Sequence, residues 1–153
     1  MDYEVQIEHV AARPLASSRV QASREQLGPV MGREMQRVFE LVCGMGVACV
    51  GAPVVFYHRF DEDIVEMDVA VPVNRVFDEV EGVRSTSLPE GEAAVITHVG
   101  PYEGIGAAWE ALTAWVQRHG SAPDAPCWEE YLTDPAAEPD PAKWVTRLYW
   151  MIT

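Results

Sequence analysis

The stretch Pro53-Val-Val-Phe-Tyr-His58 has a counterpart in Pro126-Cys-Trp-Glu-Glu-Tyr131, and this pair decides the predicted fold. Each copy follows an amphipathic helical pattern that ends in glycine, and each leads through an acidic turn into a second β-rich run. Such an internal repeat predicts a duplicated unit with a cleft along its pseudo-twofold axis. When the copies are aligned, Glu129 falls on Phe56 and Tyr131 falls on His58.

The first repeat, about residues 1–75, reads as β-α-β-β. Alternation predicts strands over 3–9 and 15–22, and Pro29 suits the first turn of a helix that ends at Gly44 and Gly46. The apolar stripe of that helix predicts a buried face; its members are Met31, Met35, Val38, Val42 and Met45. Residues 53–59 and 64–73 then form a hairpin, and a polar connector follows over 74–82.

The second repeat, about residues 83–153, follows the same plan. A strand over 93–99 precedes a helix that Pro101 opens and Gly120 ends, with strands over 127–133 and 144–152 after it. One apolar stripe of the helix is expected in the core: Ile105, Trp109, Leu112 and Val116. The sequence therefore predicts one α+β domain over residues 1–153, built from two β-α-β-β units with a ligand groove between them.

The net charge of −13 argues against nucleic acid as a partner, because the 11 lysines and arginines are scattered rather than clustered. An acidic field instead favours cationic ligands, although an acidic surface without a ligand role fits equally well. The three cysteines and four histidines show no metal-ligand spacing, so we expect neither a metal nor another cofactor. The chain shows no signal peptide and no apolar stretch long enough for a membrane span, which predicts a cytoplasmic protein.

A carboxylate among aromatic residues is the strongest candidate site. Period two puts Glu129 and Tyr131 on one face of their strand, and Trp128 with Leu132 on the other, which we interpret as the helix-side core. Glu129 and Tyr131 then face the groove, whose expected lining is Glu129, Tyr131, Tyr149, Arg147, Phe56 and His58. Aromatic walls with a carboxylate suit a delocalised cation. The alternative is a polar sheet face in contact with solvent.

Several motifs together resemble the GyrI-like proteins, also called the bacterial transcription-activator effector-binding domain. They are His98-Val-Gly-Pro-Tyr102, Trp109-Glu-Ala-Leu112, Trp128-Glu-Glu-Tyr-Leu-Thr-Asp-Pro135, the terminal Leu148-Tyr149 and Asp68-Val-Ala-Val-Pro-Val73. The resemblance spans essentially the whole chain. It implies a tandem, SHS2-like β-α-β-β fold that binds hydrophobic and often cationic small molecules.

The resemblance also implies roles for individual residues. Glu129 is expected at the floor of the pocket, with Tyr131 beside it and Tyr149 as an aromatic wall on the last strand. Tyr102 and Trp150 complete the expected ligand-binding set. Arg147 stands where some drug-sensing relatives carry a second acidic residue, which weakens the case for a strongly cationic ligand and permits a neutral one.

Three functions remain open at this stage. Stand-alone relatives sequester drugs or toxins, hydrolyse cyclopropane-bearing DNA-alkylating antibiotics, or associate with gyrase. The residues show no helix-turn-helix pattern, so we expect this chain to resemble the stand-alone relatives. Sequestration is the preferred hypothesis. For a cofactor-free hydrolase, Glu129 would orient or deprotonate water and Tyr131 would donate to an oxygen that gains charge. A gyrase-modulating protein would need a surface that the sequence does not identify.

Overall fold

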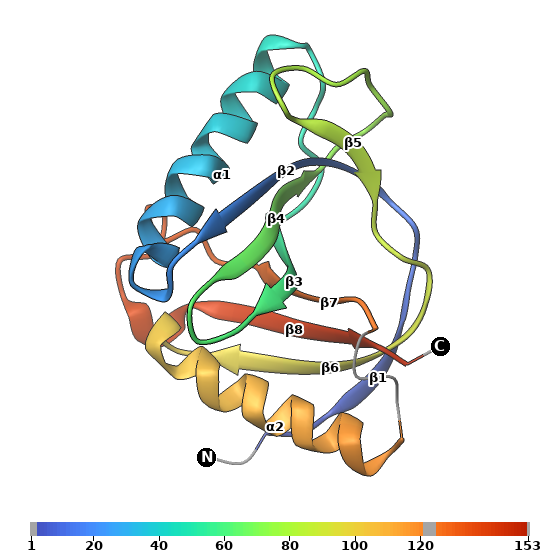
Figure 1. The fold of residues 1–153 in the computed structure, drawn as a ribbon, viewed down its shortest axis with the longest axis vertical. Coiled ribbons are helices and arrows are strands. Elements are labelled where there is room, and N and C mark those ends of the chain that lie inside the picture. The colour runs from blue at the N-terminus through green and yellow to red at the C-terminus, as the bar shows by residue number, and fades with distance from the viewer. Residues whose placement is uncertain (1–2, 121–124, 153) are drawn as a thin grey trace. The chain divides into compact units, whose positions relative to one another are not determined.

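The computed structural model describes residues 3–120 and 125–152, whose contacts divide into two compact units. The first unit is residues 12–89, and the second is residues 90–153 together with residues 1–11. Within the described residues, each unit combines one α-helix with four antiparallel strands (Figure 1). This is the α+β class that the sequence predicts.

The first unit carries its helix on a sheet with strand order β3-β4-β2-β5. Its elements are β2 (Pro14–Ala22), η1 (Arg24–Gln26), α1 (Leu27–Gly44), β3 (Val54–Phe60), β4 (Val65–Pro72) and β5 (Arg84–Ser87). The predicted helical stripe is confirmed at its centre, because Val38 and Val42 are fully buried against Ala16 and Val71. β5 was not predicted from the sequence.

The ends of α1 follow from local signals. Ser23 accepts a hydrogen bond from the backbone N–H of Gln26 at 3.3 Å and caps the short turn that leads into the helix. The helix begins at Leu27, two residues before the predicted start. After Gly44 the chain turns at Gly46, whose φ of +70° suits glycine.

The second unit has the strand order β1-β6-β8-β7. Its elements are β1 (Gln6–Val10), β6 (Gly91–Val99), η2 (Tyr102–Gly104), α2 (Ile105–Arg118), β7 (Cys127–Tyr131), η3 (Pro141–Lys143) and β8 (Val145–Met151). Helix α2 packs Ala108 and Leu112 against Ile96, Leu148 and Trp150 of the sheet. This packing fixes which face of the sheet carries the helix.

Both units therefore repeat one topology, in which a β-α-β-β motif is extended by one more strand. The extra strand of the second unit is β1, which pairs with β6 rather than with the first repeat in which the sequence placed it. Alternation identifies a strand but does not say which edge it joins. The groove between the repeats stays a prediction.

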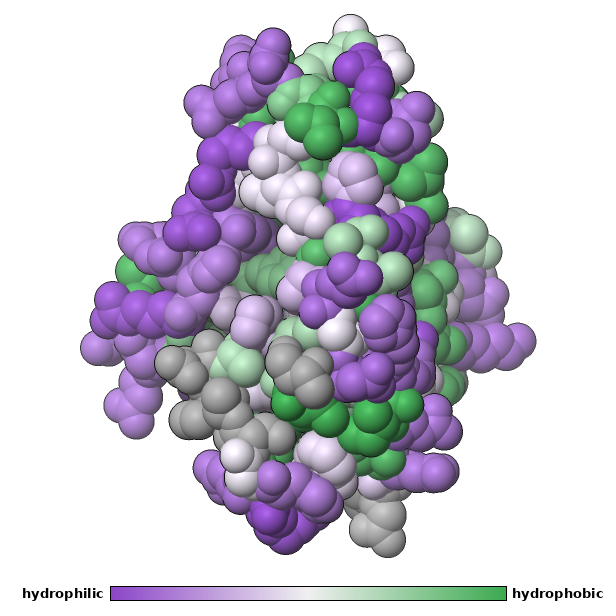
Figure 2. All heavy atoms as spheres, turned by 90° about the vertical axis from the view of Figure 1, so that its right-hand side faces the viewer, coloured by the Kyte–Doolittle hydropathy of each residue, from purple (hydrophilic) through white to green (hydrophobic). Residues whose placement is uncertain are grey.

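The face of the molecule drawn in Figure 2 is mixed in character. Hydrophobic side chains gather there in separate areas between hydrophilic ones. Among the described residues, no helix is both long and apolar enough to cross a membrane.

Candidate ligand-binding site

Glu129 lies on β7 with its carboxylate turned toward α2, and only 4% of the residue is exposed. The indole Nε1 of Trp109 donates to Oε1 of Glu129 at 2.5 Å, and the hydroxyl of Tyr131 donates to Oε2. Buried carboxylates are costly without such donors. The helix and the strand thus hold the carboxylate together, because Trp109 donates to one oxygen and Tyr131 to the other.

The prediction that Glu129 and Tyr131 face away from the helix was therefore wrong. Trp128 was taken as helix-side core, but its ring stacks on Tyr149 with centroids 4.9 Å apart, on the opposite face. Trp128 is 2% exposed and Glu129 is 4% exposed, so both faces of β7 are buried. Hydrophobicity cannot identify the helix-bearing face of a strand that is buried on both sides.

The repeat alignment was wrong for the same reason. Glu129 pairs with Leu148, a residue that packs on α2, whereas Phe56 pairs with Asp68. Val55, which pairs with Val69 on the same face as the helix-packed Val71, faces the helix in the first unit, and Phe56 faces the other side. A slip of one residue moves every side chain of a strand to the other face.

Aromatic rings extend the site from Tyr131 toward the surface. The Tyr102 ring lies edge-on to Tyr131, with centroids 5.9 Å apart, and 4.8 Å from Trp144. Tyr102 is 40% exposed. Burial, Asp134 and Glu129 all raise the pKa of its hydroxyl.

Two further positions on this face flank Glu129: Cys127 and Trp150 lie on one side of it, and Thr146, which pairs with Tyr131, lies on the other. The Trp150 ring lies 6.4 Å from that of Trp109, and Cys127 pairs with Trp150 in the sheet. Burial and the Glu129 carboxylate raise the pKa of the Cys127 thiol to about 11. The Thr146 hydroxyl is buried and has no hydrogen-bond partner among the described residues. A buried donor of this kind calls for an explanation.

Tyr149 and Arg147, two of the predicted lining residues, lie on the opposite face of the same sheet. The Tyr149 hydroxyl donates to Glu130 at 2.8 Å. The pKa of Tyr149 is raised, mainly by burial and next by the nearby Glu130 carboxylate. The Arg147 guanidinium lies 5.3 Å from the Tyr149 ring and forms an ion pair with Glu8. The structure therefore separates these residues from Glu129 by the thickness of the sheet.

Phe56 and His58 belong to the first unit, on β3. His58 donates to Asp68 at 2.8 Å, and the Nε of Arg19 donates to the same carboxylate at 2.7 Å. Burial alone would raise the pKa of Asp68, but the hydrogen bonds from Arg19 and His58 together lower it. His58 thus takes part in a polar network within this sheet.

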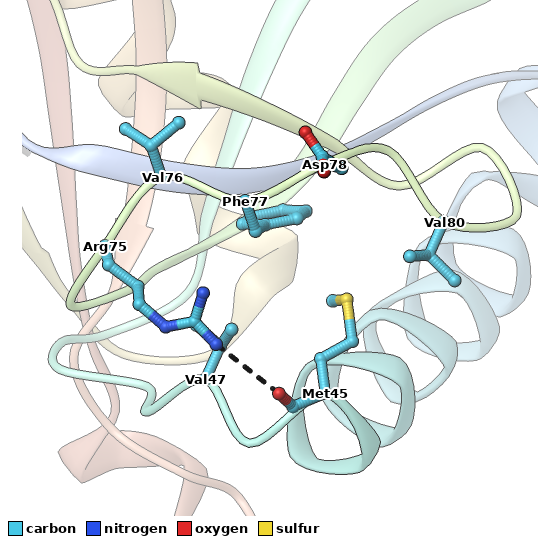
Figure 3. A pocket seen from close by; sticks show the side chains of 7 residues that line it. All are labelled: Met45, Val47, Arg75, Val76, Phe77, Asp78 and Val80. Carbon is cyan, nitrogen blue, oxygen red and sulfur yellow. Dashed lines mark hydrogen bonds between the residues drawn. The ribbon is translucent and has the colours of Figure 1, made fainter.

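The first unit also has a pocket of about 390 Å³ (Figure 3). It is lined by residues from the end of α1 and the connector after β4: Met45, Val47, Arg75, Val76, Phe77, Asp78 and Val80. Met45 and Phe77 point toward each other, and Arg75 donates to the Met45 carbonyl at 3.5 Å. None of the predicted site residues lines this pocket.

Trp109 is the site residue that the sequence analysis assigned to another role. The predicted core position is confirmed, because Trp109 packs against the cluster that contains Leu112, and its indole N–H in addition donates to Glu129. A buried indole generally requires an acceptor, and that requirement was the available signal. Across residues 3–120 and 125–152, no group of His, Cys, Asp and Glu side chains could hold a metal ion.

The sequence profile of the GyrI-like small molecule binding domain matches residues 3–153. The chain belongs to the GyrI-like family. A comparison with curated protein sequences finds no match to this GyrI-like chain.

Solved structures share this GyrI-like fold at low identity. EcmrR in a DNA complex has a TM-score of 0.86 at 18% identity; the match covers 97% of this chain and 56% of EcmrR, so this chain spans little more than half of that protein. SAV2435 bound to tetraphenylphosphonium has a TM-score of 0.69 at 12% identity, and the match covers 100% of this chain and 94% of SAV2435. A hydrolase encoded by lin2189 from Listeria innocua has a TM-score of 0.61 at 15% identity, and the match covers 98% of this chain and 92% of the hydrolase.

Proposed function

We propose that this protein binds a hydrophobic aromatic small molecule, cationic or polarised, with Glu129 as the anchoring group. The observation that carries the proposal is a buried carboxylate held by Trp109 and Tyr131 and surrounded by aromatic rings. Tyr102 and Trp150 are the remaining ligand contacts that we assign to this site. Tyr149 and Arg147 are left out because they lie on the other face.

The charge distribution supports a cationic ligand. The second unit contains three Lys and Arg residues against 13 Asp and Glu, a formal net charge of −10, whereas the first unit has eight against 11, a net charge of −3. Most of the acidic field therefore originates from the unit that contains Glu129. Such a field attracts cations and weakens as salt is added.

The hydrogen bonds of Glu129 narrow the ligand class further. Each carboxylate oxygen already accepts a bond from a side chain of the protein. A cation that carries no N–H donors, with its charge spread over aromatic groups, can still gain Coulomb attraction and contact with the rings. The relative SAV2435 was solved with tetraphenylphosphonium, a cation of this kind.

This binding would serve sequestration of a drug, antibiotic or toxin, and thereby resistance. Association with gyrase is a second hypothesis for the role of the chain, and no surface of the described residues is assigned to it. The groove between the repeats, with Phe56 and His58 in its lining, also stays a prediction.

The charge requirement can be tested by titrating the protein with tetraphenylphosphonium and with neutral triphenylphosphine oxide while tryptophan fluorescence is followed. Trp109, Trp144 and Trp150 lie in or beside the site, so occupancy should change their emission. We expect the cation to bind more tightly, by a margin that shrinks as salt is raised. Equal affinities, or no response near about 1 mM of either compound, would refute the proposal.

Hydrolysis by the same residues is the second candidate, and the Tyr131–Glu129 contact favours it. Glu129 would take a proton from water as the water attacks a cyclopropane carbon. Tyr131, whose hydroxyl donates to Glu129 in this structure, would exchange that hydrogen bond for one to the substrate carbonyl oxygen, which gains the electrons of the broken C–C bond. Mass spectrometry of a cyclopropane-bearing substrate after incubation decides this question. Turnover adds the mass of one water, and Glu129→Gln should abolish it while ligand still binds.

A further inference from the structure

We propose that the segment 98–104 positions the Tyr102 side chain in the ligand site. We further propose that Tyr3, far away in the sequence, stabilises the conformation of this segment through its hydrogen bond to His98. The motif His98-Val-Gly-Pro-Tyr102 marks this segment in the sequence. Its effect on ligand affinity rests on the proposed function, whereas its effect on the position of Tyr102 does not.

His98 is the centre of this arrangement and is 3% exposed. Its Nε2 lies 3.0 Å from the carbonyl oxygen of Pro101, which can only accept, so Nε2 carries the proton. In the neutral ring Nδ1 is then an acceptor, and the Tyr3 hydroxyl donates to it at 2.9 Å. Both ring nitrogens are thus satisfied, and the ring orientation is fixed from two sides.

Two glycines allow the chain to wrap around this ring. Gly100 has a φ of +136°, where side chains are disfavoured, and its N–H donates to the Trp144 carbonyl at 2.8 Å. Gly104 lies so close that an added Cβ would stand 2.7 Å from Cε1 of His98. Its N–H donates to the same Pro101 carbonyl that His98 contacts, at 3.1 Å.

Tyr102 lies inside this wrapped turn, directly after the carbonyl that His98 and Gly104 share. Its ring contacts the rings of Trp144 and Tyr131, and Tyr131 donates to Glu129. A contact chain runs from Tyr3 to the carboxylate. Positioning residues of this kind act through the ligand contact that they orient.

The test is a double-mutant cycle between Tyr3→Phe and Tyr102→Leu, read as affinity for tetraphenylphosphonium by calorimetry. Tyr3→Phe keeps the ring but leaves Nδ1 of His98 without its donor, so we expect about three- to tenfold weaker binding, the scale of one hydrogen bond. In the Tyr102→Leu background the same change should have no effect. His9→Gln, at an exposed histidine on β1, is the control and should bind as the unaltered protein does.

A second readout does not depend on any ligand. The ring-proton shifts of Tyr102 in the ligand-free protein should move in Tyr3→Phe and in His98→Gln, and stay in place in His9→Gln. Unmoved Tyr102 shifts, or an equal affinity loss in both backgrounds of the cycle, overturns the positioning role. If the unaltered protein does not bind tetraphenylphosphonium, the proposed function fails, and the Tyr102 shifts alone decide this inference.

Discussion

Trp109 on α2 donates its indole N–H to Glu129 on β7 across 2.5 Å, so helix and strand are joined at the carboxylate itself. An amphipathic helix usually meets its sheet through apolar contacts alone. Here the apolar stripe includes one hydrogen-bond donor, the indole N–H of Trp109. Its acceptor is Glu129, the residue that we assign to ligand binding. Changes that shift α2 are therefore expected to change the environment of Glu129.

Trp109→Phe should destabilise the protein, because it keeps most of the ring but removes one donor from a buried carboxylate. We expect a loss of about 1–3 kcal/mol in the free energy of unfolding, measured by urea denaturation. Trp115→Phe is the matched control on the same helix, since the Trp115 ring stacks on His119 and the indole that donates to Glu129 is that of Trp109. If the two variants lose equal stability, the indole–carboxylate bond is not the cause.

Cys127 should resist alkylation in the folded protein, whereas Cys43, which is exposed, should react. With a thiol pKa of about 11, only about 0.1% of Cys127 is thiolate at pH 8. Mass spectrometry after brief iodoacetamide treatment reports both sites. Removing the nearby charge with Glu129→Gln should lower the pKa of Cys127 and speed its reaction, and an unchanged rate would contradict the contact.

Asp68 should make stability depend on pH in the acid range. The pKa of Asp68 is lowered in the folded state. Its contribution to the free energy of unfolding is therefore complete above its pKa in the unfolded chain, which is about 4, and is lost as pH falls through its pKa in the folded protein. Urea midpoints at neutral and acid pH should therefore differ less in Asp68→Asn than in the unaltered protein. Glu79→Gln, at an exposed position in the same unit, should leave that difference intact.

Thr146→Val should leave the ligand-free protein as stable as before, or slightly more stable. The Thr146 hydroxyl is buried without a partner among the described residues, and replacing it by a methyl group of similar size removes a desolvation cost. Thermal unfolding with and without tetraphenylphosphonium checks this. A stability loss greater than about 1 kcal/mol without ligand would show that the hydroxyl is bonded in solution.

Both helices and most strands were predictable from periodicity, but β5, the sheet partner of β1 and the faces of the strands were not. Alternation and helical spacing place the elements because they depend on local geometry alone. The orientation of Glu129 depends on which buried face of β7 receives α2, and Trp128 and Glu129 are equally hidden. The hydrophobicity of the individual residues therefore does not show which face of β7 carries α2.

The composition of the site was predictable only in part, because alternation groups residues by face but does not say which face carries the helix. Glu129, Tyr131 and Trp150 lie on one face of the sheet, where Tyr102 contacts Tyr131, whereas Tyr149 and Arg147 lie on the other face. The role of these residues in ligand binding stays a prediction. The missing donor, Trp109, comes from a helix whose stripe looked purely apolar. Its partner becomes visible only when the helix is docked on the strand.

Paired calorimetric titrations of Glu129→Gln and Glu130→Gln with tetraphenylphosphonium test the central claim most directly. The two carboxylates are neighbours on β7 but face opposite sides, one toward Trp109 and the other toward Tyr149. Glu129→Gln keeps the shape and removes the charge, so binding should weaken by about 1–3 kcal/mol, while Glu130→Gln should bind as before. Equal losses in both variants, or undiminished binding by Glu129→Gln, would contradict the assignment of Glu129 as the anchor.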